Sequence, residues 1–157
     1  MKQSRFVYVI YIRTSKEKLW QALTDPDYTR KYWVNTQQES DWQIGSPWCI
    51  RFADGRVADS GKILEIDPPH KLVIEWRNEF IPEMHADGYS HMSYDLEQIG
   101  ESVKLTLVHE IDLPNSQLIH GVANGWPQIL SSLKSLLETG ESLEATRDLP
   151  KELQLKG

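Results

Sequence analysis

The longest helical pattern of the chain lies between Gln117 and Glu138. Apolar side chains recur there at steps of three and four, which places them on one stripe of a helix whose other side is polar. The stripe consists of Trp126, Ile129, Leu130, Leu133 and Leu137. Asn115 or Ser116 can cap the start, and Gly140 can end the helix in the left-handed conformation. A helix of this length extends about 33 Å and can cross a small domain.

The first third of this helix carries two glycines and a proline. Gly121 and Gly125 leave gaps where side chains would stand, and Pro127 removes one N–H group from the helical ladder. We therefore expect a kink near Ala123 to Gly125, with tight packing after it and looser packing before it.

Upstream of the helix the pattern changes to a period of two residues, which is typical of strands with one buried face. The alternating segments are 48–52, 57–66, 72–77, 92–96 and 103–110. Short turns join several of them, so they are predicted to form an antiparallel meander. Gly61 interrupts the second segment and is expected to mark a bulge.

The N-terminal part predicts one strand and two short helices. Residues 6–12 are apolar on both alternating faces, so this strand is expected to be covered on two sides or to lie at a sheet junction. Thr14 or Ser15 can cap a helix that stops at 25–27, and a second helix covers about 28–32. The polar segments 35–41 and 78–87 have no clear period and are predicted to be loops.

These elements predict an α+β fold in which a curved antiparallel sheet wraps around the long C-terminal helix. One face of such a sheet must be covered, and this helix is the element long and apolar enough to do so. The covering is expected to be least complete at the glycines, which predicts a cavity rimmed by Trp33 and Trp126. The 157 residues fit a single domain (1–157) with a core at about 6–140. In the tail, 141–157, Leu149 and Leu153 can form a helical stripe that docks or dimerises, but we expect a frayed end.

Composition narrows the possible functions. The net charge is -6 and the cationic residues are scattered, so the chain is not expected to bind nucleic acid. Its longest apolar run, 6–12, is far shorter than the roughly 20 residues of a membrane span. With no signal-peptide pattern and a lone Cys49, we expect a cytoplasmic protein without membrane insertion. Six Trp and six Tyr indicate a cavity or interface, although an aromatic core has the same composition.

Three segments, in this order along the chain, resemble the START-like helix-grip superfamily (SRPBCC). They are residues 14–26, followed by Tyr32 and Trp33, then 61–72 and 125–130. The branch they resemble most is that of homologues of the heat-shock chaperone ATPase activator, and the resemblance covers about 7–140. It implies the helix-grip fold for a superfamily that holds lipid carriers, hormone-binding proteins, aromatase/cyclases and chaperone activators.

The resemblance also implies a deep apolar pocket between the concave face of the sheet and the terminal helix. The implied ligand-binding positions are Trp33, Trp48, Phe52, Ile74, Trp76, Met92, Tyr94, His109, Trp126 and Leu130. Leu133 and Leu137 are expected to be sealed core instead.

Sequence motifs of common catalytic sites are absent. No phosphate-binding glycine loop, dinucleotide fingerprint, nucleophile elbow or zinc-binding helix occurs. A metal site would need at least three of four side chains to converge, and a solvated acidic loop is the preferred interpretation. Those four are Glu83, His85, Asp87 and His91. Ser90 with His91 and Asp95 has the residue types of a catalytic triad, but strand parity separates Ser90 from the other two. We therefore expect no catalytic residue set, no metal and no cofactor.

The polar candidates for the pocket each have two interpretations. His109 has the inward parity of Leu105 and Leu107, so its imidazole either orients a ligand or hydrogen-bonds a protein neighbour. The hydroxyl of Tyr94 offers the same alternatives. Trp126 either lines the pocket or wedges between helix and sheet.

Our hypothesis is that the chain binds an apolar or aromatic small molecule in this cavity. The first alternative is a cyclase- or hydrolase-type enzyme with His109 as acid or base. It needs a second titratable group, and the inner faces offer only tyrosines, so we favour a binding protein over an enzyme. The second alternative is an interaction module like the chaperone ATPase activators, with a role in the stress response. A chaperone or a second copy of the chain is the candidate macromolecular partner.

Overall fold

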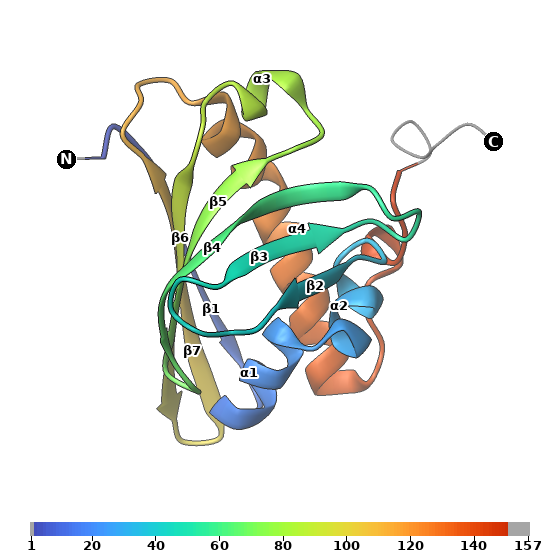
Figure 1. Ribbon diagram of the computed structural model, residues 1–157. Helices are drawn as coiled ribbons and strands as arrows, with labels where there is room; N and C mark the ends of the chain where they lie inside the picture. The colour runs from blue at the N-terminus through green and yellow to red at the C-terminus, as the bar shows by residue number, and fades with distance from the viewer. Residues whose placement is uncertain (1, 151–157) are drawn as a thin grey trace.

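Within residues 2–150, which the structure describes, seven strands form one antiparallel sheet that curves around a long helix (Figure 1). The structure is a computed structural model. The strands are β1 (Ser4–Ile12), β2 (Gln37–Ser40), β3 (Pro47–Arg51), β4 (Val57–Asp67), β5 (Lys71–Asn78), β6 (Ser90–Ile99) and β7 (Ser102–Ile111). The helices are α1 (Lys16–Thr24), α2 (Pro26–Tyr32), α3 (Pro82–His85), α4 (Gln117–Thr139) and the 3-10 turn η1 (Glu144–Thr146). The predicted α+β fold is confirmed.

The strand order is β1-β7-β6-β5-β4-β3-β2, so the first strand pairs with the last one. The concave face consists of alternate residues of β3 to β7, as the period of two predicted. Each of these side chains is at most 5% exposed: Trp48, Ile50, Leu72, Ile74, Trp76, Met92, Tyr94, Leu96, Val103, Leu105, Leu107 and His109. Helix α4 lies against this face and, with it, encloses the core (Figure 1).

Gly61 does not mark the bulge that the sequence predicted. It pairs in register with Trp76, and the irregularity of β4 falls between Ile63 and Glu65. A Cβ atom at Gly61 would lie 1.6 Å from the backbone oxygen of Glu75. The glycine is therefore required because β4 and β5 approach each other too closely for any side chain.

Strand β1 is covered on one face and forms an edge of the one sheet in the described residues, so both predicted alternatives, two covered faces and a sheet junction, are wrong. Phe6, Tyr8 and Ile10 point toward the core, whereas Val7, Val9 and Tyr11 lie on the outer face and are 45–50% exposed. No second layer packs on that side within the described residues. At the edge of the sheet, Lys134 and Glu138 of α4 contact the backbone of β1, where Lys134 Nζ donates to the Tyr11 carbonyl and Glu138 accepts from the Arg13 N–H.

The segment predicted as a polar loop at 35–41 contains strand β2, which pairs with β3. Its inward residue is Gln38, which is 5% exposed. The Gln38 amide donates to the Leu23 carbonyl and accepts from Trp48 Nε1 at 2.9 Å. The inner position of this strand is therefore occupied by a hydrogen-bonded polar side chain. Since no apolar residue stands there, the sequence of the strand has no hydrophobic period.

The two short helices follow β1 as predicted. Ser15 caps α1 by accepting from the Lys18 N–H, and α1 buries Leu19 and Leu23. Helix α2 begins two residues earlier than predicted, because Asp25 caps it and Pro26 fits its first turn. These caps fix where the chain turns back toward the concave face.

Helix α4 begins and ends where the sequence indicated. The Ser116 side chain accepts from the Ile119 N–H, and Gly140 ends the helix with φ 89°. The helix is continuous through Pro127. Leu130 and Leu133 are fully buried. Leu137 packs only partly buried against the core, so the expectation that it is sealed is wrong.

The described part of the tail packs on the domain, so the expectation of a frayed end is wrong for residues 141–150. Thr146 hydrogen-bonds Ser132 of α4 at 2.6 Å, and its carbonyl accepts from the Val34 N–H. Leu149 joins the core at 9% exposure. Leu153 lies outside the described residues.

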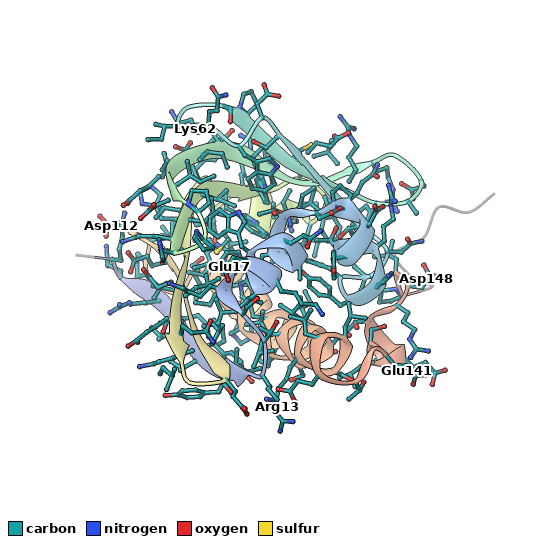
Figure 2. The ribbon with its side chains drawn as sticks, turned by 90° about the horizontal axis from the view of Figure 1, so that it is seen from below. Arg13, Glu17, Lys62, Asp112, Glu141 and Asp148 are labelled. Atoms are coloured by element: carbon teal, nitrogen blue, oxygen red, sulfur yellow. The ribbon has the colours of Figure 1, made fainter. Side chains whose placement is uncertain are left out.

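Charged side chains are distributed around the molecule. Figure 2 labels six of them, which come from separate parts of the chain: Arg13, Glu17, Lys62, Asp112, Glu141 and Asp148. Among the described residues, no helix is both long enough and apolar enough to cross a membrane.

Candidate functional site

Three tryptophans from three separate elements meet between the sheet and α4. Trp33 follows α2, Trp76 lies on β5 and Trp126 lies on α4. The rings of Trp33 and Trp76 stack at 6.2 Å, and Trp126 meets them edge-on at 5.2 Å and 5.7 Å. These separations are within the range in which aromatic pairs stabilise each other. The three indoles form one aromatic surface, which we call the tryptophan cluster.

A cavity of about 330 Å³ lies beside the tryptophan cluster. Its walls come from the end of β5, the following loop and α3, β4, and the first half of α4. The lining residues are Trp33, Asp59, Trp76, Asn78, Phe80, Ile81, Met84, Gly121, Val122, Gly125, Trp126 and Ile129. The cavity therefore lies at the glycine-bearing turns of α4, where the sequence placed it, with Trp33 and Trp126 in its wall.

The two helix glycines contribute differently to this cavity. A Cβ atom at Gly121 would lie 2.5 Å from Met84 Cε, so this glycine allows α3 to approach α4. A Cβ atom at Gly125 would meet nothing within 4 Å. Gly125 is thus the position where the missing side chain leaves space unfilled.

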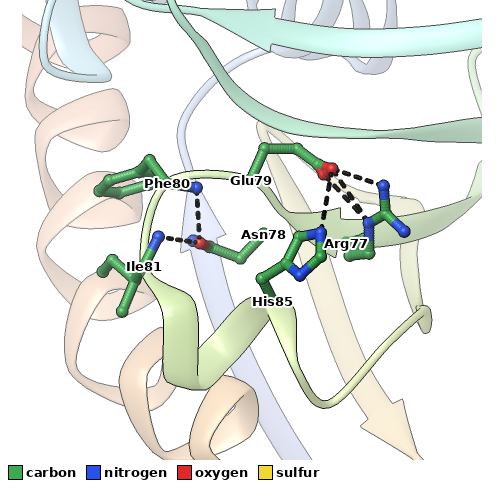
Figure 3. Close-up of polar contacts among 6 residues, drawn as sticks. All are labelled: Arg77, Asn78, Glu79, Phe80, Ile81 and His85. Carbon is green, nitrogen blue, oxygen red and sulfur yellow. Dashed lines mark hydrogen bonds and ion pairs between the residues drawn. The ribbon is translucent and has the colours of Figure 1, made fainter.

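The wall opposite the helix is the segment from Asn78 to His85, which we predicted to be a loop and which contains the short helix α3. The Asn78 side chain accepts from the N–H groups of Phe80 and Ile81, at 3.1 and 2.8 Å (Figure 3). Glu79 points away from them and pairs with Arg77 at 2.7 Å and His85 at 3.8 Å (Figure 3). These contacts fix the backbone that presents Phe80 and Ile81 to the cavity.

The same wall is attached to the start of α4 through Asp87. Its carboxylate accepts from Ser116 Oγ at 2.7 Å and from the Leu118 N–H at 2.9 Å. A carboxylate at this position satisfies a free helix N–H and interacts favourably with the helix dipole. Asp87 therefore has a structural partner, and no metal-ligand group of three or more acidic, His or Cys side chains forms in residues 2–150.

Trp33 reaches the cavity because the backbone reverses directly after it. Val34 and Asn35 have φ of 44° and 58°, in the left-handed region that a β-branched residue rarely adopts. The Val34 N–H donates to the Thr146 carbonyl at 2.7 Å, which holds this turn. Strain of this kind persists where surrounding contacts enforce it.

His109 is completely buried and connects two of the tryptophans. Its Nδ1 accepts from Trp126 Nε1 at 3.1 Å, and its Nε2 lies 2.7 Å from Ser90 Oγ, which donates to the Trp76 carbonyl. Since an indole only donates, the imidazole is neutral with its proton on Nε2. Burial lowers the pKa of His109 to about 3. Both nitrogens have protein partners, so His109 orients Trp126 and does not face the cavity.

Asp59 is a buried carboxyl in the cavity wall that the sequence reasoning missed. It pairs in register with Asn78, is 9% exposed, and its Oδ1 accepts from Trp76 Nε1 at 2.9 Å. Burial raises the pKa of Asp59 to about 7 against the effect of the Trp76 hydrogen bond, and the charge of Glu79 adds to the rise. The sequence does indicate this position, because Asp59 lies four residues before Ile63 on the same strand and side chains at even spacing point to the same face.

The ten residues implied as ligand-binding occupy two layers. Trp33, Trp76 and Trp126 line the cavity. The others are Trp48, Phe52, Ile74, Met92, Tyr94, His109 and Leu130, all buried in the core cluster or bonded to it. Several of them support the wall, since Trp48 packs on Trp76 at 4.7 Å and Tyr94 meets Trp126 at 6.1 Å. Burial raises the pKa of the Tyr94 hydroxyl, which stays neutral.

A larger hollow of about 840 Å³ lies on the outer side of β2, β3 and β4. Four of its charged side chains form two ion pairs, Arg51 with Glu39, and Lys62 with Glu75 at 3.9 Å. Burial, with a smaller contribution from Glu39, raises the pKa of Cys49 to about 11, so its thiol is not a nucleophile at neutral pH. The smaller cavity has the aromatic lining and the buried carboxyl, and we therefore regard it as the candidate site.

A sequence profile identifies the family. The profile of the family described as Activator of Hsp90 ATPase homolog 1-like protein matches residues 13–138. The chain belongs to this family. Among curated proteins, none matches this Hsp90-activator-like chain at a significant level.

Solved structures share the fold of this family member. The Aha1 dimer from Colwellia psychrerythraea is 23% identical, with a TM-score of 0.71 over 88% of this chain and 98% of that chain. An Hsp90 activator from Plasmodium falciparum is 22% identical, with a TM-score of 0.69 over 85% and 96%. CalU16 from Micromonospora echinospora is 21% identical, with a TM-score of 0.69 over 87% and 77%. The resemblance to the START-like helix-grip superfamily is confirmed, and at these identities the likeness concerns the fold.

Proposed function

We propose that the chain binds an apolar or aromatic small molecule in the cavity beside the tryptophan cluster. The observation that supports this proposal most is an apolar pocket of about 330 Å³, open to the surface, with three tryptophans in its wall. Ligand sites are concave, mostly apolar and of about this size. The helix-grip architecture of the family is consistent with a cavity at this place.

Within this proposal the predicted residues have two roles. Trp33, Trp76 and Trp126 contact the ligand through their ring faces and edges. Trp48, Tyr94 and His109, together with the remaining buried positions, hold those rings in place. Burial of an aromatic ligand against three indoles provides the main favourable free energy, at about 25 cal/mol per Å² of apolar surface.

The test fills the cavity from the helix side. Gly125→Leu extends a side chain into the space where a Cβ meets nothing within 4 Å. The control is Asn124→Leu, which adds the same side chain at the neighbouring exposed position. Naphthylmethanol, a neutral aromatic probe, is titrated by calorimetry, and the Trp76 and Trp126 indole N–H signals are followed by NMR.

We expect the probe to bind wild type and the Asn124 variant, and to bind the Gly125 variant at least tenfold more weakly. Circular dichroism confirms that both variants are folded. Equal affinity for both variants, or no binding to wild type, contradicts the proposal.

A second candidate is interaction with a chaperone of the Hsp90 class. The family description and the exposed row of Val7, Val9 and Tyr11 on β1 favour it. The measurement is the ATPase rate of the chaperone with added wild type, with Val9→Glu and with the exposed control Glu97→Gln. Stimulation that the Val9 variant loses and the control retains supports this candidate, and an unchanged ATPase rate with wild type excludes it.

A further inference from the structure

The cavity has a carboxyl group whose hydrogen-bonding capacity is half used. Asp59 Oδ1 accepts from Trp76 Nε1, while Oδ2 accepts no hydrogen bond from residues 2–150. The side chain is nine-tenths buried and lines the cavity. Because Asp59 lines the cavity and Oδ2 keeps its acceptor capacity free, a ligand in the cavity can donate a hydrogen bond to this oxygen.

The charges around Asp59 leave its negative charge uncompensated. The charged neighbour that acts on it is Glu79, which has the same sign. Glu79 is itself paired with Arg77 and His85 on the outer side of the wall. Helix α4 contributes only glycine, Val122, Trp126 and Ile129 to the cavity, so no cation reaches Asp59 from that side. A positive group on a ligand would supply the missing charge.

The aromatic lining is also suited to a cation. The cavity is bounded by Trp33, Trp76 and Trp126, with Phe80 on the opposite wall. An indole attracts an ammonium group through the negative face of its ring, and tryptophan is the strongest such partner among the aromatic side chains. An acidic group at the edge of such an aromatic enclosure completes the recognition chemistry of an amine.

We propose that the ligand of this cavity is an aromatic or apolar amine in its protonated form, held by Asp59 and the tryptophan cluster. This inference rests on the proposed function, because it specifies the ligand class of the same site. The ammonium group donates to Asp59 Oδ2, and the apolar part of the ligand lies against the indoles. The net charge of -6 favours the approach of a cation.

Because burial raises the pKa of Asp59, binding of a cation should release protons that can be measured. Near pH 7 a fraction of the carboxyl is protonated in the empty cavity, since burial raises its pKa to about 7. A bound cation favours the carboxylate, so binding releases a fraction of a proton. The neutral alcohol of the same shape does not favour the carboxylate and releases none.

The experiment compares two probes that differ only in the polar group, naphthylmethylamine, which is protonated at neutral pH, and naphthylmethanol. Both are titrated by calorimetry at pH 8 into wild type and Asp59→Asn, which keeps an acceptor for Trp76. Titrations at pH 7 in two buffers of different ionisation enthalpy measure the released protons.

We expect wild type to bind the amine at least tenfold more tightly than the alcohol. In Asp59→Asn this ratio should fall to about one, and proton release should disappear. If the alcohol binds wild type and the amine binds no more tightly, or if the Asp59 variant keeps the ratio, the amine proposal is wrong and the proposed function stands. If neither probe binds, the proposed function itself fails.

Discussion

The two halves of α4 face the same sheet, but the later turns pack tightly against it and the earlier turns border a cavity. In the later turns, Leu130 and Leu133 are fully buried, and Ser132 holds the tail through Thr146. In the earlier turns, Gly121 and Gly125 stand where large side chains would be, and a cavity remains beside Trp126. One continuous helix thus closes the core at one end and leaves a cavity at the other. The difference comes from side-chain volume along the helix, because glycines replace large side chains in the earlier turns.

The largest expected effect concerns the buried carboxyl of the open half. In the unfolded chain Asp59 ionises near pH 4, whereas burial raises its pKa to about 7 in the folded chain. Between these values the unfolded chain has lost a proton that the folded chain keeps, so the free energy of unfolding falls as pH rises. Three pKa units correspond to a loss of up to about 4 kcal/mol, complete above pH 7.

The measurement is urea denaturation of wild type and Asp59→Asn from pH 4 to pH 8. The free-energy difference between the two proteins should change across this range in favour of the variant. Other carboxyls titrate equally in both and cancel. A constant difference would show that Asp59 titrates normally and that the open half is better solvated than its burial indicates.

The second effect compares truncation in the two halves. Leu133→Ala removes a side chain with no exposed surface and should lower the free energy of unfolding by about 3 kcal/mol. Ile129→Ala, four residues earlier, truncates a side chain that already borders the cavity, so its cost should be nearer 1 kcal/mol. Chemical denaturation of both variants checks this, and equal losses would remove the distinction between a closed and an open half.

The smallest expected effect is the difference in stability between alanine substitutions at the two helix glycines. Gly125→Ala should raise the free energy of unfolding by about 0.5 to 1 kcal/mol, because alanine favours a helix and its methyl group meets nothing within 4 Å. Gly121→Ala places a methyl group against Met84, which must move, so its gain should be smaller or absent. Thermal melts of the pair measure the difference. A larger gain at Gly121 would mean that α3 packs loosely on α4.

Much of the fold could be predicted because its signals are local. The stripe of α4, its caps and the alternation of β3 to β7 depend on neighbouring residues, and each was placed correctly. Strand β2 was missed because Gln38 replaces apolar burial with two hydrogen bonds, to Leu23 and Trp48. Both partners are remote in sequence, so no local pattern could reveal them.

The site was predictable in position and less so in chemistry. Missing side chains at the helix glycines indicated where space would remain, and Trp33 and Trp126 do border it. His109 and Tyr94 were the polar candidates, each with a ligand or a protein neighbour as its partner. The inward parity of His109 was correct, and its two nitrogens have protein partners, Trp126 and Ser90. Asp59 could be recognised only once β4 was aligned with β5, because its burial depends on the register that places it opposite Asn78.

The contact of α4 with the first strand has a consequence for assembly. Lys134 and Glu138 bind the backbone groups of Tyr11 and Arg13 that the sheet leaves free at the end of β1. At this edge of the sheet, a strand from another molecule can therefore pair only along the beginning of β1, while β2 forms the opposite edge. Open sheet edges are templates for uncontrolled polymerisation, and a pair of charged side chains at an edge opposes it. The helix that borders the cavity thus also limits strand pairing at the β1 edge.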